Sequence, residues 1–246
     1  LHYPVHIKLD TGMHRLGFGP GDTDELAGRL AGQQHLRVVS MFSHLAASEA
    51  PEHDAFTHRQ AMLLTEAAER LKTALGYTFN LHILNSSGIS RFPEYQFDMI
   101  RLGIGLYGIG CYEGVALRHT GRFMTAVSQV RTVAAGEPVS YGCRGTSDHD
   151  REIAVIPVGY ADGLRRIMGD GRGSLFVKGH RVPITGSICM DMCMADVTGL
   201  SVRAGDEVEV FGTNIPIEEI AALCNTIPYE ILTSIPPRVK RIYVNE

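Results

Sequence analysis

The residues best able to do chemistry in this sequence stand at the ends of short apolar runs in its first half. A lysine close to an aspartate, a histidine, an asparagine–serine pair and an arginine each end such a run. These side chains are Lys8, Asp10, His44, Asn85, Ser86 and Arg101. Each alone is a common strand-end or turn residue, but their joint placement indicates a site for a charged small molecule.

Two of these segments have the residue types of a phosphate-binding site. Asn85 and Ser86 begin a predicted helix, and the turn Gly103-Ile104-Gly105 follows Arg101. Backbone N–H groups at a helix start and in a glycine-rich turn can bind an anionic phosphate. A phosphate-bearing ligand is therefore one prediction, and an ordinary turn with a helix cap is the alternative.

The elements that must position these groups alternate between strand and helix. Strands are predicted at 5–10, 37–44, 77–84 and 99–102, and helices at 23–31 and 51–75. This alternation indicates βαβ units and a parallel sheet, and in an α/β barrel the carboxyl ends of the strands carry the active site. Because a closed (β/α)8 barrel has eight strands, we expect only the second half of a TIM-like barrel, with its first half absent.

The pattern changes near residue 115. Beyond it, short β runs are separated by Gly, Pro and Asp turns, and one helix is predicted at 217–224, which indicates a mostly antiparallel β domain. The predicted β runs are 127–133, 153–158, 174–177, 182–185 and 208–211. We therefore expect a partial α/β barrel (strands 5–8) over residues 1–115 and a C-terminal β domain over residues 116–246.

Two tyrosines of the second half stand beside glycines at predicted turns, Tyr141 after Ser140 and Tyr160 after Gly159. A tyrosine acts as a general base only when nearby positive charge lowers its pKa from about 10. The stretch 189–194 is rich in sulfur, for which adaptable packing is the simplest interpretation.

Composition and charge exclude several other classes. A formal net charge of −4 gives no electrostatic case for nucleic-acid binding. No apolar run approaches the ~18 residues of a membrane span, and no secretion signal is evident. Five scattered cysteines argue against a disulfide framework and for a reducing, cytoplasmic compartment, and the Cys189–Cys193 pair has no partner pair for a zinc site, so no metal is expected.

Several longer motifs occur in one order along the chain. They are Lys8-Leu9-Asp10-Thr11-Gly12-Met13-His14-Arg15, Asn85-Ser86, Arg101-Leu102-Gly103-Ile104-Gly105, Val139-Ser140-Tyr141-Gly142, Pro157-Val158-Gly159-Tyr160-Ala161-Asp162-Gly163 and Ile188-Cys189-Met190-Asp191. Together they resemble the bacterial alanine racemases, whose C-terminal two-thirds the sequence covers. The resemblance implies a pyridoxal-phosphate (PLP) α/β barrel followed by a β domain. It also implies interconversion of L- and D-alanine through a PLP aldimine by two-base proton exchange, which supplies D-alanine for peptidoglycan.

The resemblance assigns the first half to the cofactor. His44 corresponds to the residue that packs on the pyridine ring, and Arg101 to the partner of the pyridine nitrogen. Because arginine does not readily lose its proton, this nitrogen stays largely unprotonated, which favours simple proton exchange. Arg15 lies near the cofactor oxygen and the substrate carboxylate, and Lys8 matches an often carbamylated lysine. The phosphate positions are Asn85, Ser86, Gly103 and Ile104.

The resemblance assigns the second half to catalysis and substrate entry. Tyr141 corresponds to the catalytic tyrosine, and Tyr160, Met190 and Asp191 to residues that line the entrance and the substrate pocket. In the family these residues reach into the partner subunit's site, so a homodimer with shared active sites is implied.

The lysine that binds PLP covalently is expected in a motif that this sequence lacks. The four lysines, Lys8, Lys72, Lys178 and Lys240, lie in other contexts, so we expect this fragment alone not to racemise. The alternatives are a non-catalytic remnant that dimerises or binds phosphate ligands, and a fold-related PLP decarboxylase of basic amino acids. Gly145 and residues 235–239 depart from the family pattern, so serine or another small amino acid is an alternative substrate.

Overall fold

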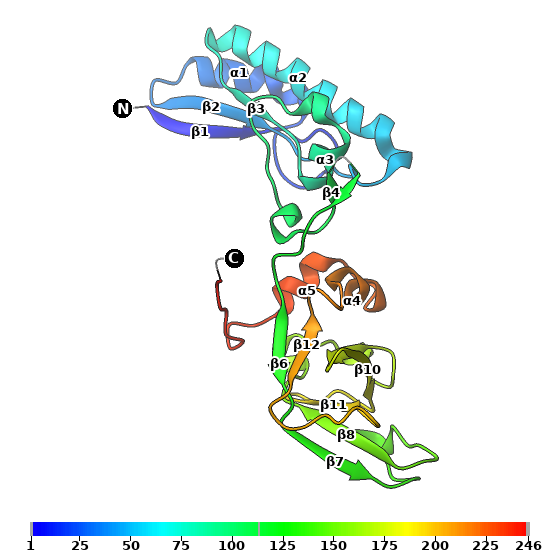
Figure 1. Ribbon diagram of the computed structural model, residues 1–246. Coiled ribbons are helices and arrows are strands. Elements are labelled where there is room, and N and C mark those ends of the chain that lie inside the picture. Colours follow the sequence, from blue (N-terminus) through cyan, green and yellow to red (C-terminus); the bar gives the residue numbers. More distant parts are fainter. Residues whose placement is uncertain (1, 113, 245–246) are drawn as a thin grey trace. The chain divides into compact units, whose positions relative to one another are not determined.

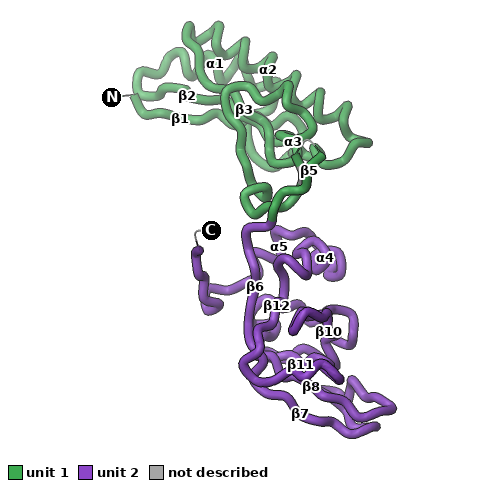
Figure 2. The backbone as a smooth tube through the Cα atoms, in the orientation of Figure 1, with its two compact units in different colours: residues 1–118 green, residues 119–246 purple. Residues whose placement is uncertain are grey.

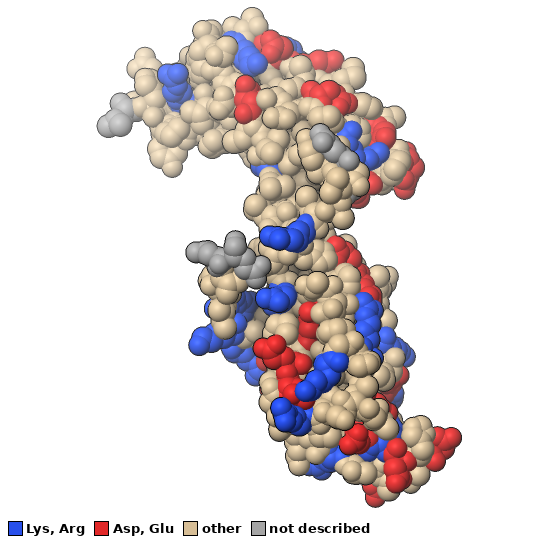
Figure 3. Space-filling model, in the orientation of Figure 1, with Lys and Arg blue, Asp and Glu red and all other residues tan. Residues whose placement is uncertain are grey.

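A parallel sheet and an antiparallel sheet form the centres of two units, residues 1–118 and residues 119–246 (Figure 2). The computed structural model describes residues 2–112 and 114–244. Within these ranges no helix is long and apolar enough to cross a membrane. Figure 3 shows acidic and basic side chains interspersed on one face of each unit.

The first unit contains a three-stranded parallel sheet with two long helices on one face (Figure 1). Its strands, in spatial order, are β1 (Tyr3–Lys8), β2 (Leu36–Phe42) and β3 (Asn80–His82). The covering helices are α1 (Thr23–Ala31) and α2 (Asp54–Leu75), while α3 (Ser86–Arg91) follows β3, and β4 (Cys111–Tyr112) pairs with β5 (Val115–Ala116). Each parallel connection therefore passes through a helix, as the predicted βαβ pattern requires.

The two faces of this sheet differ in chemistry because side chains alternate along a strand. On the helix-covered face, Ile7, Met41 and Leu81 are buried in one apolar cluster with α1 and α2. The alternate positions point to the other face and include three polar residues, His6, Ser40 and His82, beside the ring of Phe42. The sheet thus carries an apolar face for folding and a polar face available for a site.

The strand predicted at 99–102 is wrong, since no strand forms there. Asp98 and Arg101 each donate one backbone hydrogen bond to the chain at β3, to the carbonyls of Leu81 (3.1 Å) and Leu84 (3.0 Å). The segment lies alongside this chain without a continuous ladder. Among the described residues no further strand pairs with its outer side, so its apolar run is partly exposed rather than buried between neighbours.

The second unit is a seven-stranded sheet whose neighbouring strands are all antiparallel. In spatial order these are β6 (Phe123–Ala126), β12 (Glu207–Phe211), β9 (Ser174–Val177), β10 (His180–Thr185), β11 (Cys193–Asp196), β8 (Arg151–Ile156) and β7 (Gln129–Val133). Two short helices follow, α4 (Ile217–Leu223) and α5 (Pro228–Ser234). The predicted run 127–133 corresponds to β7, and sequence reasoning did not predict β6, β11 or α5.

The tight turn of the β9–β10 hairpin fixes the pairing register of these two strands. Val177 pairs with His180, which leaves a two-residue turn of Lys178 and Gly179. Both turn residues have positive φ, 51° and 83°, the pattern of a type I′ turn whose twist suits antiparallel strands. Two longer loops, after β8 and between β10 and β11, carry the residues of interest described below.

Candidate functional site

The carboxyl ends of the strands in the first unit converge on the guanidinium of Arg101. Its Nη2 donates to the carbonyls of Ser43 (2.7 Å) and Ile83 (3.2 Å), one residue beyond β2 and β3. The same atom lies 3.4 Å from His44 Nδ1, and Nη1 donates to His82 Nδ1. Two predicted site residues, His44 and Arg101, are therefore adjacent.

Positive charge gathers around His44. Burial lowers the pKa of His44, and the charges of Arg101, Arg15 and Lys8 lower it further. At neutral pH the ring is therefore uncharged, while the surrounding cations favour an anionic ligand. Burial also lowers the pKa of the Arg101 guanidinium, which nonetheless remains a cation and a pure hydrogen-bond donor.

Lys8 lies at the end of β1, where its Nζ donates to the carbonyl of Leu16 at 2.5 Å. Burial lowers its pKa most, Asp10 opposes this change, and Arg15 and Arg101 reinforce it. Asp10 orders the following loop by accepting from the backbone N–H groups of Gly12 (3.0 Å) and His14 (2.9 Å). These two bonds also lower the pKa of Asp10.

The hydroxyl of Ser86 links the predicted phosphate-binding residues through hydrogen bonds. Asn85 caps α3 by accepting from the Gly88 N–H at 2.9 Å. Ser86 Oγ, one residue on, accepts from the N–H groups of Gly103 (2.9 Å) and Gly105 (3.2 Å). A Cβ on Gly105 would lie 2.7 Å from the end of the Leu102 side chain, which would have to shift. Asn85, Ser86, Gly103 and Ile104 are thus brought together.

Sequence reasoning missed His82, the group that contacts Arg101 most closely. It is 4% exposed and stacks on the ring of Phe42, with centroids 4.9 Å apart and planes at 4°. Burial, then the charges of Arg101 and His6, lowers its pKa to about 4. The available signal was its position two residues before the predicted strand's end, on the same face as Ser40.

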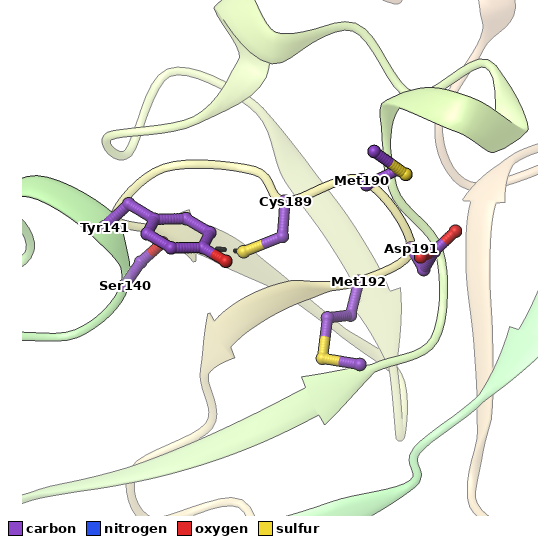
Figure 4. A pocket seen from close by; sticks show the side chains of 6 residues that line it. All are labelled: Ser140, Tyr141, Cys189, Met190, Asp191 and Met192. Atoms are coloured by element: carbon purple, nitrogen blue, oxygen red, sulfur yellow. Dashed lines mark hydrogen bonds between the residues drawn. The ribbon is translucent and has the colours of Figure 1, made fainter.

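The second unit brings three of its four predicted residues to one hollow of about 490 Å3 (Figure 4). Tyr141 is 73% exposed, and it lines this hollow together with Cys189 (Figure 4). Ser140 Oγ anchors this segment by donating to the carbonyl of Ser187 at 2.5 Å. The lining residues are Ser140, Tyr141, Cys189, Met190, Asp191 and Met192.

Tyr160 does not line this hollow, but its backbone is bound to the loop that does. Its N–H donates to the carbonyl of Cys189 (3.1 Å), and the next N–H donates to that of Met190 (3.0 Å). Gly159 makes this approach possible, because a Cβ there would lie 2.2 Å from the carbonyl oxygen of Met190.

The described part of the chain contains neither a disulfide nor a cluster of metal-ligating side chains. The cysteines whose side chains are described, Cys143, Cys189, Cys193 and Cys224, are free. No group of His, Cys, Asp and Glu among the described residues could hold a metal ion.

Family models and known proteins match both units. Residues 2–110 match the N-terminal domain of alanine racemase, and residues 121–243 match its C-terminal domain. The alanine racemases of Desulfovibrio desulfuricans and Desulfosudis oleivorans are 37% and 39% identical, over 98% of this chain and 66% of each relative. The chain therefore spans about two-thirds of the length of these curated relatives.

Solved structures of alanine racemases also match this chain. Alanine racemase from Streptomyces lavendulae matches with a TM-score of 0.92 at 31% identity, over 100% of this chain and 67% of that one. The enzyme from Bartonella henselae, described with covalently bound pyridoxal phosphate, matches at 0.85 and 34%, over 98% and 66%. Fold and site define a protein that joins a partial α/β barrel to an antiparallel β domain, which confirms the predicted fold class. The chain belongs to the alanine racemase family, as the motifs predicted.

Proposed function

We propose that this chain contributes the cofactor-binding and tyrosine-bearing parts of an alanine racemase. The observation that carries the proposal is the donor-only guanidinium of Arg101, set at the strand ends beside a neutral His44. A donor there leaves a ring nitrogen unprotonated, which suits simple proton exchange.

The residues present fit the phosphate and ring of PLP. Ser86, Gly103 and Ile104, with Asn85 at the helix cap, would hold the phosphate, because the Ser86 hydroxyl accepts from the Gly103 and Gly105 N–H groups and keeps its own proton to donate. His44 would pack on the ring, and Arg15 would bind the substrate carboxylate. PLP, when bound, supplies the electron sink that acidifies the Cα–H of an amino acid.

Lys8 fits a supporting role. Its lowered pKa favours the neutral amine, the form that reacts with carbon dioxide to give a carbamate. A carbamate would replace a positive charge with a negative one near Arg15. We propose that the modified Lys8 orients Arg15 toward the substrate.

Tyr141 is proposed to move the proton at the substrate Cα on one face. Its exposed ring suits a residue that enters the site of a partner subunit in a homodimer, with Met190, Asp191 and Tyr160 at the entrance. The other face requires a lysine that also binds PLP. The four lysines of the printed sequence lie in other contexts, so the proposed activity requires that residue in addition.

The test supplies that lysine by joining this chain to the first part of a family barrel that carries it. Exchange of the alanine Cα proton for deuterium is then followed by NMR, with chiral analysis of the product, after addition of PLP and L-alanine. Racemisation that is lost in Tyr141→Phe and kept in Tyr229→Phe, an exposed tyrosine of α5, supports the proposal. If the Cα proton of serine exchanged faster than that of alanine, serine would be the substrate instead. Loss of a carboxyl group from lysine or arginine would indicate the decarboxylase.

A second candidate function is favoured by the contexts of the four lysines. In that case the chain is a non-catalytic protein that binds a phosphate-bearing ligand through Ser86. PLP or inorganic phosphate would then bind, and binding would weaken in Ser86→Ala, while neither alanine enantiomer would exchange its Cα proton even in the joined protein that supplies the lysine.

A further inference from the structure

Four side chains form one hydrogen-bond chain across the whole parallel sheet. His6 on β1 and Ser40 on β2 are paired in register, with His6 Nδ1 2.6 Å from Ser40 Oγ. Ser40 Oγ lies 3.3 Å from His82 Nε2 on β3, and His82 Nδ1 contacts Arg101 Nη1. Each strand of the sheet therefore contributes one group on the polar face.

The direction of every bond follows from the chemistry at one end. A guanidinium has no acceptor atom, so His82 Nδ1 must accept from Arg101. A neutral imidazole that accepts at Nδ1 carries its proton on Nε2, and therefore donates to Ser40 Oγ. Ser40 has one hydroxyl proton, which is directed to His6 Nδ1. The chain runs as Arg101 to His82 to Ser40 to His6, with no donor facing a donor.

Because two members of this hydrogen-bond chain are buried, losing one of its bonds is energetically costly. Ser40 and His82 are 2% and 4% exposed, so water cannot readily replace a lost partner, and an unpaired buried donor is unfavourable. The ring of His82 is also held by its stack on Phe42. The choice between the two tautomers of His82 therefore rests on which neighbour accepts and which donates.

We infer that Ser40 and His6 are positioning residues: Ser40 accepts the Nε2–H of His82 while His6 accepts the Ser40 hydroxyl, and together they hold the His82 ring so that its Nδ1 fixes the Arg101 guanidinium for its ligand. The second Arg101 nitrogen is already held by the carbonyls of Ser43 and Ile83. With Nη1 held by His82, the whole guanidinium plane is fixed. The identity of that ligand as PLP rests on the proposed function, whereas the tautomer does not.

The experiment is 15N NMR of the histidine rings and arginine side chains in the chain without added ligand. We expect one His82 tautomer, with Nδ1 unprotonated. In His6→Ala the Ser40 hydroxyl loses its acceptor and can turn toward His82 Nε2, where its proton opposes the Nε2–H, so the His82 and Arg101 signals should broaden. Because His6 is exposed, this variant should fold. Ser40→Ala should broaden the His82 and Arg101 signals, and Ser40→Thr should restore them.

Ser43→Ala is the matched control, because it removes a buried hydroxyl after the same strand, one that bonds Thr11 and not His82. It should leave the His82 and Arg101 signals as sharp as in the original chain. Both Ser40→Ala and His6→Ala should weaken PLP binding roughly three- to ten-fold, the range of one hydrogen bond. An unchanged His82 spectrum in both variants would overturn the inference. A correct tautomer in a chain that fails to bind PLP would count against the proposed function alone.

Discussion

The guanidinium of Arg238 donates a 2.8 Å hydrogen bond to the carboxylate of Asp191. Its Nε also donates to Asp162 at 2.9 Å, and the other oxygen of Asp162 accepts from the Gly159 N–H. One residue from the segment after α5 therefore ties together the two loops around the Tyr141 hollow. Both carboxylates raise the pKa of Arg238.

Arg238→Gln should loosen the loop that contains Cys189. Because exposed ion pairs are individually weak, we expect alkylation of Cys189 by iodoacetamide to rise only about two- to five-fold. Mass mapping would follow Cys189 with the exposed Cys143 as an internal reference. Arg131→Gln, which removes an exposed arginine elsewhere in the unit, should alkylate at the unmodified rate. Equal Cys189 rates in all three proteins would mean that Arg238 does not hold the loop.

His82 should make the chain less stable in mild acid. Its pKa is about 4 in the folded chain against about 6.5 when unfolded, so the unfolded state binds the extra proton. The contribution of His82 to the free energy of unfolding should be fully present above pH 6.5. It should be lost as the pH falls from 6.5 to 4, by at most about 3 kcal/mol.

Urea unfolding followed by circular dichroism at several pH values would measure this dependence. His82→Asn should remove the contribution of this residue from the slope. His53→Gln, a histidine at the exposed start of α2, should keep it. A slope that is unchanged in His82→Asn would refute the low pKa.

Asn85→Ala should destabilise the first unit by about 1–2 kcal/mol. The change removes the cap of α3 and the partner of the Ser48 hydroxyl, 2.7 Å from Asn85 Oδ1. Asn85→Asp keeps both acceptors, so it should lose little stability while its negative charge weakens phosphate binding. Denaturant midpoints and phosphate titrations separate the two effects, and equal stability of the alanine variant and the original chain would contradict the capping role.

Gly159→Ala should lower the stability of the second unit by at least about 2 kcal/mol. Its new Cβ would lie 2.2 Å from the carbonyl oxygen of Met190 and 2.4 Å from that of Cys189, and backbone cannot move aside cheaply. Gly121→Ala is the control, because its Cβ meets nothing within 4 Å and should change stability by under about 0.5 kcal/mol. Similar thermal midpoints for both variants would argue against the tight loop contact.

Local pattern predicted the elements whose own residues decide their structure. The α2 face and its Gly76 terminus, with φ 72°, follow from helical periodicity and glycine's freedom at positive φ. The segment 99–102 depends instead on neighbours. Its apolar residues match a buried strand, but two isolated backbone bonds do not make a ladder.

The site residues, too, fall into those marked by the local sequence and those that depend on their neighbours in the fold. Arg101, His44 and Ser86 could be proposed from the sequence, because polar residues beside apolar runs stand out, although no strand forms before Arg101. His82 was not, because a histidine inside a strand has no local mark of burial. Its role comes from register, since its pairing with Phe42 sets the ring two positions from Ser40 on the neighbouring strand.

Ser140, which precedes Tyr141, has φ 77° and ψ −178°, a region occupied almost only by glycine and costing about 1–3 kcal/mol. The Ser187 carbonyl holds it there through the Ser140 hydroxyl. Opening this segment releases the stored energy, whereas opening β8 or β10 releases none. Amide hydrogens at 140–143 should therefore exchange with solvent well before those of the sheet beneath, so that the proposed catalytic tyrosine sits on a part of the unit that opens more readily than the sheet.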